Sequence, residues 1–188
     1  MRSAKKRSNQ TRARILTAAR VRFSRYNYEN VSIRDVAADA GVDSALISRY
    51  FGGKQKLYVK AIKGAFRIEG YLIDDLDQLG AHLVSLVLHA RDQPVANDID
   101  PLKVLLHAAG SPATANVVSR IFHAEFVLPV ARVLPGRDPK LRAALIGSIL
   151  IGLGTLHHAL GSATITAAEK RKVTAIVGAA VQLCITPK

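Results

Sequence analysis

The segment from Asp43 to Phe51 places small and polar side chains on one face of an expected helix of about two turns. Ile47 and Phe51 are four residues apart and would face a core. The opposite side carries only small or polar residues and one cation, which are Ser44, Ala45, Ser48 and Arg49. Small residues on that face let a helix enter the major groove of DNA, where base edges are read. The chemistry expected of this segment is therefore binding, with no bond made or broken.

Positive charge surrounds this segment. The chain has 188 residues and a net charge of +13. Residues 1–67 contain 16 Lys or Arg against four acidic residues, so they carry +12 of this charge, and the remainder of the chain is nearly balanced. The asymmetry predicts that one end of the molecule binds a polyanion. Nucleic acid is the first candidate, because Lys and Arg neutralise its phosphates, and an anionic membrane is the second.

Two more helices are expected to position the segment. Residues 9–25 repeat apolar side chains at helical spacing, with basic residues on the remaining face. Residues 33–40 form a second helix behind Ser32, which has an Asp three residues later as in a capping box. Gly41 supplies the left-handed residue that ends this helix. The pattern predicts a helix-turn-helix, preceded by a basic and mobile arm over residues 1–8.

The rest of the chain predicts only helices. A fourth helix begins at Lys54, and Pro129 should kink the helix that contains it. Turn residues and apolar periodicity place the others at about 78–91, 101–110, 112–133, 138–161 and 166–185. The expected fold class is all-α with about nine helices. It comprises an N-terminal arm and helix-turn-helix domain over residues 1–53 and a helical regulatory and dimerisation domain over residues 54–188.

Several classes of protein find no support in the sequence. It has no glycine-rich phosphate loop, no nucleophile elbow and no paired carboxylates beside a base, so we expect neither an enzyme nor a cofactor. The lone cysteine, Cys184, excludes an intrachain disulfide and suits a reducing, cytoplasmic compartment. Residues 143–160 lack charged side chains, but their two His, Ser, Thr and Gly residues favour a buried or interface helix over a membrane span.

Residues 15–62 resemble the tetracycline-repressor (TetR) family of bacterial transcription regulators. The matching stretch is ILTAARVRFSRYNYENVSIRDVAADAGVDSALISRYFGGKQKLYVKAI. It has an amphipathic helix ending in Phe, then Ser-x-Arg-x-Val-Ala, Gly-Val, a short helix ending in Tyr-Phe, and Lys-x-x-Leu. The resemblance implies a dimeric repressor that a small-molecule ligand releases from DNA. An alternative keeps the DNA-binding dimer but replaces the ligand with a protein partner or with no ligand.

The resemblance also assigns roles to residues of the helix-turn-helix. The base-facing positions correspond to Arg34, Ser44, Ala45 and Ser48. Arg34 is the strongest direct reader, because an Arg pairs with both acceptors of guanine. The phosphate-contacting positions correspond to Ser32, Arg49, Tyr50 and Lys54. Two residues depart from the family pattern: Asp43 stands at a position where many relatives have Ser, and Ser48 stands where Tyr is frequent. Pairing of Arg34 with Asp35 or Asp39 is the alternative to base contact.

The family uses its C-terminal helices to dimerise and to enclose a ligand. The apolar segment and the last helix supply the expected dimer interface, made of Ala144, Gly147, Ile151, Gly154, Val173, Ile176, Val177 and Val181. Two-fold symmetry would then present two recognition helices to a palindromic operator in double-stranded DNA. Candidate ligand-pocket residues are His82, His89, His107, Asn116, Phe122, His123 and Phe126. A hydrogen-bonded or surface role is the alternative for each histidine, and no metal site is expected.

Overall fold

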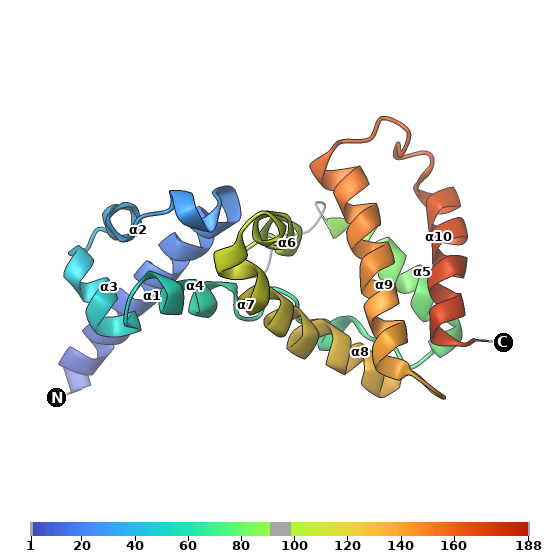
Figure 1. The fold of residues 1–188 in the computed structure, drawn as a ribbon, viewed down its shortest axis with the longest axis horizontal. Coiled ribbons are helices and arrows are strands. Elements are labelled where there is room, and N and C mark those ends of the chain that lie inside the picture. The colour runs from blue at the N-terminus through green and yellow to red at the C-terminus, as the bar shows by residue number, and fades with distance from the viewer. Residues whose placement is uncertain (1, 91–98, 188) are drawn as a thin grey trace. The chain divides into compact units, whose positions relative to one another are not determined.

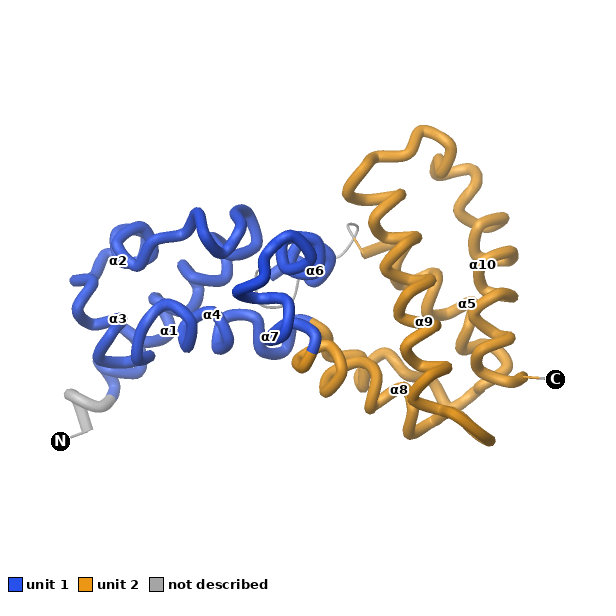
Figure 2. The backbone as a smooth tube through the Cα atoms, viewed as in Figure 1, with its two compact units in different colours: residues 1–65, 95–119 blue, residues 66–94, 120–188 orange. Residues whose placement is uncertain are grey.

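The structure is a computed structural model that describes residues 2–90 and 99–187. Over these residues every regular element is helical, which confirms the expected all-α class. The chain forms two compact units (Figure 2). Unit 1 comprises residues 1–65 and 95–119, and unit 2 comprises residues 66–94 and 120–188. Packing thus groups residues 54–65 and 95–119 with the first three helices, whereas the sequence analysis divided the chain at residue 53.

Unit 1 contains the predicted helix-turn-helix. Its first four helices are α1 (Arg2–Arg25), α2 (Ile33–Ala40), α3 (Ser44–Phe51) and α4 (Lys54–Ile62), as Figure 1 shows. Helix α1 packs against α2 and α4, and α6 (Pro101–Ala109) packs against α1. The core is apolar, and side chains that are at most 2% exposed include Ile15, Phe23, Val36, Ile47, Leu57 and Ile62.

Helix α1 begins at Arg2, which corrects the expected start at residue 9 and includes residues 2–8 of the expected arm. The first residues include Ala, Lys and Arg, which favour helices, and contain no Gly or Pro to interrupt one. The sequence analysis began the helix at residue 9 because apolar periodicity starts only there.

Unit 2 is built around the close approach of α5 (Leu76–Leu88) and α10 (Lys170–Ile185). A Cβ atom added at Gly80 would lie 2.6 Å from the carbonyl oxygen of Gly178, so only glycine fits at this crossing. Gln182 bridges the two helices, because its Oε1 accepts from the Gly80 N–H at 3.0 Å and its Nε2 donates to the Leu76 carbonyl at 2.8 Å. Helix α9 (Pro139–Gly154) packs against both.

The segment Pro112–Val133 is continuous, as the sequence predicted, but it is not a uniform α-helix. Helix α7 (Pro112–Phe122) passes through a π-helical turn at His123–Val127 into α8 (Leu128–Val133). Pro129 lacks an N–H group and its ring would clash with the carbonyl of Glu125, four residues earlier. The wider π turn accommodates both effects. With this segment taken as one helix, the described residues contain nine helices, as expected.

One helix of unit 2 passes a composition test for a membrane span. Residues Pro139–Ala159 have a mean hydropathy of 1.3 over an 18-residue window, and 39% of that window is buried. Core helices of globular proteins pass the same test. Here the helix packs against α5, α8 and α10 within unit 2, which fits the interpretation as a buried or interface helix.

Candidate nucleic-acid interface

Local hydrogen bonds fix the two helices of the helix-turn-helix. Ser32 Oγ accepts from the Asp35 N–H at 3.0 Å, and Asp35 Oδ2 accepts from the Ser32 N–H at 3.0 Å, which is the predicted capping box. Gly41 ends α2 with φ 59°, in the left-handed region. Asp43 then caps α3 by accepting from the Ala45 N–H at 2.7 Å. The Asp that departs from the family pattern is therefore the N-cap of the recognition helix.

The outer face of α3 carries the predicted polar side chains. Ile47 points into the core and is 0% exposed. Ala45, Ser48 and Arg49 are exposed, and Ser44 and Tyr50 are half-buried. Ser44, Ala45 and Ser48 are all small, so the backbone of α3 can approach a surface closely at these positions. This geometry suits insertion into a major groove.

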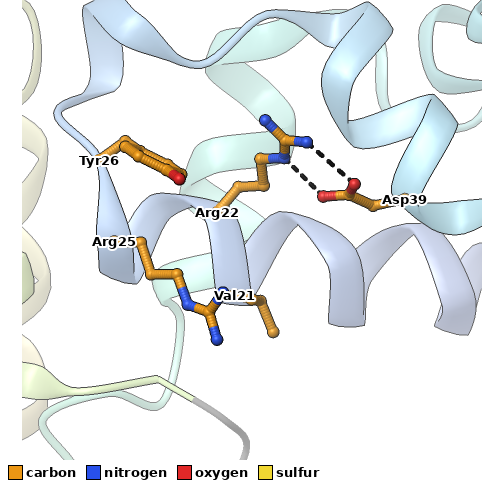
Figure 3. Close-up of a pocket in the computed structure, with 5 residues that line it drawn as sticks. All are labelled: Val21, Arg22, Arg25, Tyr26 and Asp39. Carbon is orange, nitrogen blue, oxygen red and sulfur yellow. Dashed lines mark hydrogen bonds and ion pairs between the residues drawn. The ribbon is translucent and has the colours of Figure 1, made fainter.

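Arg34 is exposed on α2, and the acids that were its alternative partners are already engaged. Asp35 belongs to the capping box, where the Ser32 hydroxyl donates to it at 2.7 Å and lowers the pKa of its carboxyl. Asp39 accepts two hydrogen bonds from Arg22, which lower the pKa of its carboxyl (Figure 3). Among the described residues Arg34 has no ion pair. Its guanidinium is available to a partner outside the chain.

Ser32 is less available than the family pattern implies. Its hydroxyl donates to Asp35 Oδ2, and its backbone N–H donates to the same oxygen. A phosphate contact would need one of these two donors. The structure therefore favours a capping role for Ser32 over the phosphate contact that we expected from the resemblance.

Two contacts near the proposed phosphate-binding residues were not predicted. The Arg12 guanidinium carbon lies 5.0 Å from the centroid of the Tyr50 ring, which adds an exposed cation of α1 beside the end of α3. The Lys54 ammonium lies 4.2 Å from the centroid of the Tyr28 ring and 3.4 Å from the Glu29 carbonyl oxygen. Burial lowers the pKa of Lys54. The sequence placed Arg12 on the basic face of α1, but it offered no signal that pairs residues so far apart in the chain.

The predicted ligand-pocket residues divide between the two units. His107 and Asn116 belong to unit 1 and the other five to unit 2. Asn116 and His123 are exposed. His82 Nε2 lies 2.9 Å from the Tyr71 carbonyl oxygen, and His89 Nδ1 lies 2.9 Å from that of Ser85.

Phe122 and Phe126 serve the packing of unit 2. Their rings stack at a centroid distance of 5.0 Å, and Phe66 meets Phe122 edge-on at 5.5 Å. A Cβ atom added at Gly147 would lie 2.9 Å from Phe122 Cζ and 3.1 Å from Phe126 Cε1. The small residue at position 147 thus accommodates these rings within one chain.

The expected dimer-interface residues divide into two groups. Gly147, Gly154 and Val181 are buried within their own chain, because those sides of α9 and α10 face the core of unit 2. Ala144 and Ile176 are exposed, and Ile151, Val173 and Val177 are half-buried. The uncovered face also carries large apolar side chains that the sequence analysis did not name, which are Leu141, Leu145, Leu156, Leu160 and Leu183. Because residues 143–160 are apolar on all sides, the sequence did not indicate which side of this helix would stay exposed.

Two cavities lie in unit 1, beside α1. The smaller, of about 140 Å³, is shown in Figure 3 and is lined by Val21, Arg22, Arg25, Tyr26 and Asp39. The Arg22 guanidinium in it is already paired with Asp39. The larger is an open groove of about 670 Å³ between α1 and the end of α2. Over the described residues no group of three His, Cys, Asp or Glu side chains is placed to hold a metal ion.

Two family models match the chain. Residues 15–61 match the model described as bacterial regulatory proteins, tetR family. Residues 77–185 match the model described as tetracyclin repressor-like, C-terminal domain. No curated protein matches the sequence.

Solved structures share the fold over almost the whole chain. A TetR-family regulator from Streptomyces coelicolor A3 is 26% identical, with a TM-score of 0.58, and the match covers 94% of this chain and 95% of that one. A TetR-family transcriptional regulator from Rhodococcus sp. is 17% identical, with a TM-score of 0.69 and coverage of 95% and 100%. A transcriptional regulator from Pseudomonas aeruginosa PAO1 is 20% identical, with a TM-score of 0.65 and coverage of 90% and 89%. The last two likenesses concern the fold alone.

Proposed function

The chain belongs to the tetracycline-repressor (TetR) family of bacterial regulatory proteins, and from this premise we propose that it is a dimeric repressor of a palindromic operator. It is a DNA-binding transcriptional regulator and not an enzyme. The observation that carries the proposal is the exposed, uncommitted Arg34 beside the small outer face of α3. An Arg in that position can donate to both major-groove acceptors of a guanine.

Within the proposed interface, base contacts and phosphate contacts come from different residues. Arg34 reads a base pair, and Ser44, Ala45 and Ser48 line the surface that faces the groove. Arg49, Tyr50 and Lys54 contact phosphates, and Arg12 joins them because it lies against Tyr50. Phosphate contacts supply affinity that depends on salt, and base contacts supply sequence preference.

The experiment that tests this function is the selection of duplexes from a randomised library by the wild-type protein. We expect enrichment of a two-fold symmetric site whose half-sites are separated by one turn of DNA or a multiple of it. Lys54→Ala should weaken binding, and Arg132→Ala should not, because Arg132 is an exposed cation on α8 of unit 2. The proposal would be contradicted if the selection enriched no sequence over the starting library.

Dimerisation is proposed through the uncovered sides of α9 and α10. Leu141 and Leu145 lie on α9, and Leu156 follows in the π-helical turn Thr155–Ala159; Leu141 is 61% exposed. On α10, Ile176 is 63% exposed and Leu183 is 62% exposed. Burial of these side chains against a second copy would remove apolar surface from water. The same faces on the partner would complete a four-helix arrangement with two-fold symmetry.

Control by a small-molecule inducer is part of the proposal, as is usual in the family. An alternative is also supported: the same dimer controlled by a protein partner or by no ligand. The observation in its favour is that six of the seven predicted pocket residues are exposed or engaged in packing or hydrogen bonds, whereas His107 Nδ1 is buried without a hydrogen-bond partner among the described residues. Titration of candidate ligands with and without the selected duplex separates the two. An inducer must bind the DNA-bound protein less tightly than the free protein, by the same factor by which it weakens DNA binding.

A further inference from the structure

Ser111 lies at the corner between α6 and α7, yet its side chain contacts the helix-turn-helix. It is 2% exposed, and its Oγ donates to Glu29 Oε1 at 2.5 Å. Glu29 belongs to the short 3-10 turn Tyr28–Asn30 between α1 and α2. This hydrogen bond is the largest cause of the lowered pKa of Glu29. Residues 82 positions apart in the chain are therefore joined within unit 1.

A second contact ties the same corner to the neighbouring aromatic side chains. Thr114 is 2% exposed, and its hydroxyl lowers the pKa of the Tyr58 phenol against the larger effect of burial, which raises that pKa to about 12. The Tyr58 ring meets Tyr28 edge-on at a centroid distance of 5.2 Å and Phe23 at 4.9 Å. The corner thus acts on the side chain of Glu29, next to Tyr28, and on the phenol of Tyr58, whose ring packs against Tyr28.

Tyr28 and Glu29 in turn hold the side chain of Lys54 at the start of α4. The ring face of Tyr28 attracts the ammonium at 4.2 Å, and the Glu29 carbonyl oxygen lies 3.4 Å from Nζ. An ammonium has three donors, and these contacts occupy one of them. A lysine held in this way loses less side-chain freedom on binding a phosphate than a lysine that moves freely in solvent.

We propose that Ser111 is a positioning residue for DNA binding: through Glu29 and Tyr28 it sets the place of the Lys54 ammonium, which contacts one operator phosphate in each half-site. The proposal rests on the DNA-binding function inferred above. It also gives the α6–α7 corner a route to operator affinity that leaves the base-reading face of α3 unchanged. A displacement of the corner that breaks the Ser111–Glu29 hydrogen bond would weaken binding equally at every sequence.

The test compares charge-matched variants on the duplex that the wild-type protein selects. Glu29→Gln keeps an acceptor for Ser111, and Glu29→Ala removes it, while both remove the same negative charge near Lys54. Glu29 is exposed, so neither change threatens the core. Ser111→Ala removes the hydrogen-bond donor to Glu29 and leaves the charge of the protein unchanged. Each variant is made alone and with Lys54→Ala, and affinity is measured over a range of salt concentrations.

We expect Ser111→Ala and Glu29→Ala to weaken binding by about tenfold, as for the loss of a hydrogen bond to a charged group. Glu29→Gln, which keeps the acceptor, should bind about tenfold more tightly than Glu29→Ala. The slope of log affinity against log salt should shrink by about 0.9 for each half-site. In the Lys54→Ala background the three variants should differ little. Equal losses with and without Lys54, or an unchanged slope in Ser111→Ala, would overturn the proposal. Failure of wild-type protein to select any duplex would instead overturn the proposed function.

Discussion

The Arg22 guanidinium on α1 holds Asp39 on α2 by two hydrogen bonds, from Nη2 to Oδ1 at 2.9 Å and from Nε to Oδ2 at 2.5 Å (Figure 3). This pair fixes α2 against α1 and neutralises an acid that lies near Arg34 in the chain. Without Arg22, Asp39 would be a partner for Arg34 or a charge that repels DNA. Arg34, the proposed base reader, therefore has no competing acid at position 39, because Arg22 already occupies that carboxylate.

The Arg22–Asp39 pair predicts a dependence of stability on pH. Arg22 lowers the pKa of the Asp39 carboxyl, so its stabilisation is complete above the unfolded pKa of about 3.9 and is lost as the pH falls through the folded value. We expect Asp39→Asn to lower the free energy of unfolding by less than about 1 kcal/mol at pH 7, because the Asp39 side chain is 39% exposed. The difference in unfolding free energy between the wild-type protein and Asp39→Asn should become smaller toward pH 3. Urea unfolding of both proteins at the two pH values measures it, with Asp74→Asn, at an exposed acid of unit 2, as the control.

Two substitutions in unit 1 should separate base reading from phosphate binding. Arg34→Ala should reduce the preference for one base pair by about 1–3 kcal/mol, because a paired contact with guanine is lost. Lys54→Ala should weaken all duplexes alike and reduce the salt slope. Competition binding against the selected site with each position changed in turn would show the difference. Loss of affinity in Arg34→Ala with an unaltered preference at every position would remove Arg34 from the base readers.

Local signals in the sequence predicted the helix-turn-helix closely. The Ser32–Asp35 capping box and Gly41 act over a few residues, so their structure depends little on the rest of the chain. The inward positions of Ile47 and Phe23 follow from helical spacing alone. The outer face of α3 could be assigned from the sequence for the same reason.

Contacts between distant segments could not be predicted in this way. Nothing in the order of residues pairs Ser111 with Glu29 or places Lys54 on the Tyr28 ring. The free side of α9 was also hidden, because apolar residues surround that helix and its periodicity has no clear phase. Gly147 suggested close approach to a partner chain, and the structure shows close approach to Phe122 of the same chain.

The exposed apolar faces of unit 2 predict the effect of charge on oligomeric state. Leu145→Arg and Ile176→Arg place a cation on surfaces that the proposed dimer would bury, so we expect dissociation and weaker DNA binding. Leu106→Arg is the matched control, because Leu106 is an exposed apolar residue of α6 in unit 1. Sedimentation at micromolar concentration measures the change. A wild-type monomer, or a dimer that tolerates both substitutions, would place the interface elsewhere.

Two glycines of α9 should respond in opposite ways to the same substitution. Gly147→Ala forces a methyl group against the Phe122 and Phe126 rings and should cost about 1–3 kcal/mol of unfolding free energy. Gly152→Ala meets nothing within 4 Å in the chain and should stabilise the helix by up to about 1 kcal/mol. Unfolding of the two variants in urea compares them. Any penalty from Gly152→Ala should appear in the dimer equilibrium, since Gly152 is exposed on α9.

The helical start of α1 predicts a contribution to affinity that carries no sequence information. Residues 2–7 contain four of the basic residues, and Lys6 and Arg7 are exposed on a helix that continues to Arg12, beside Tyr50. Removal of residues 2–7 should reduce the salt slope by about 0.9 for each phosphate contact that is lost, and it should leave the selected sequence unchanged. Replacement of Lys5, Lys6 and Arg7 by Gln keeps the length of the helix and should have most of the same effect. If the Gln variant binds with the wild-type slope while the truncation does not, the residues support α1 through its length and the charge makes no contact with DNA.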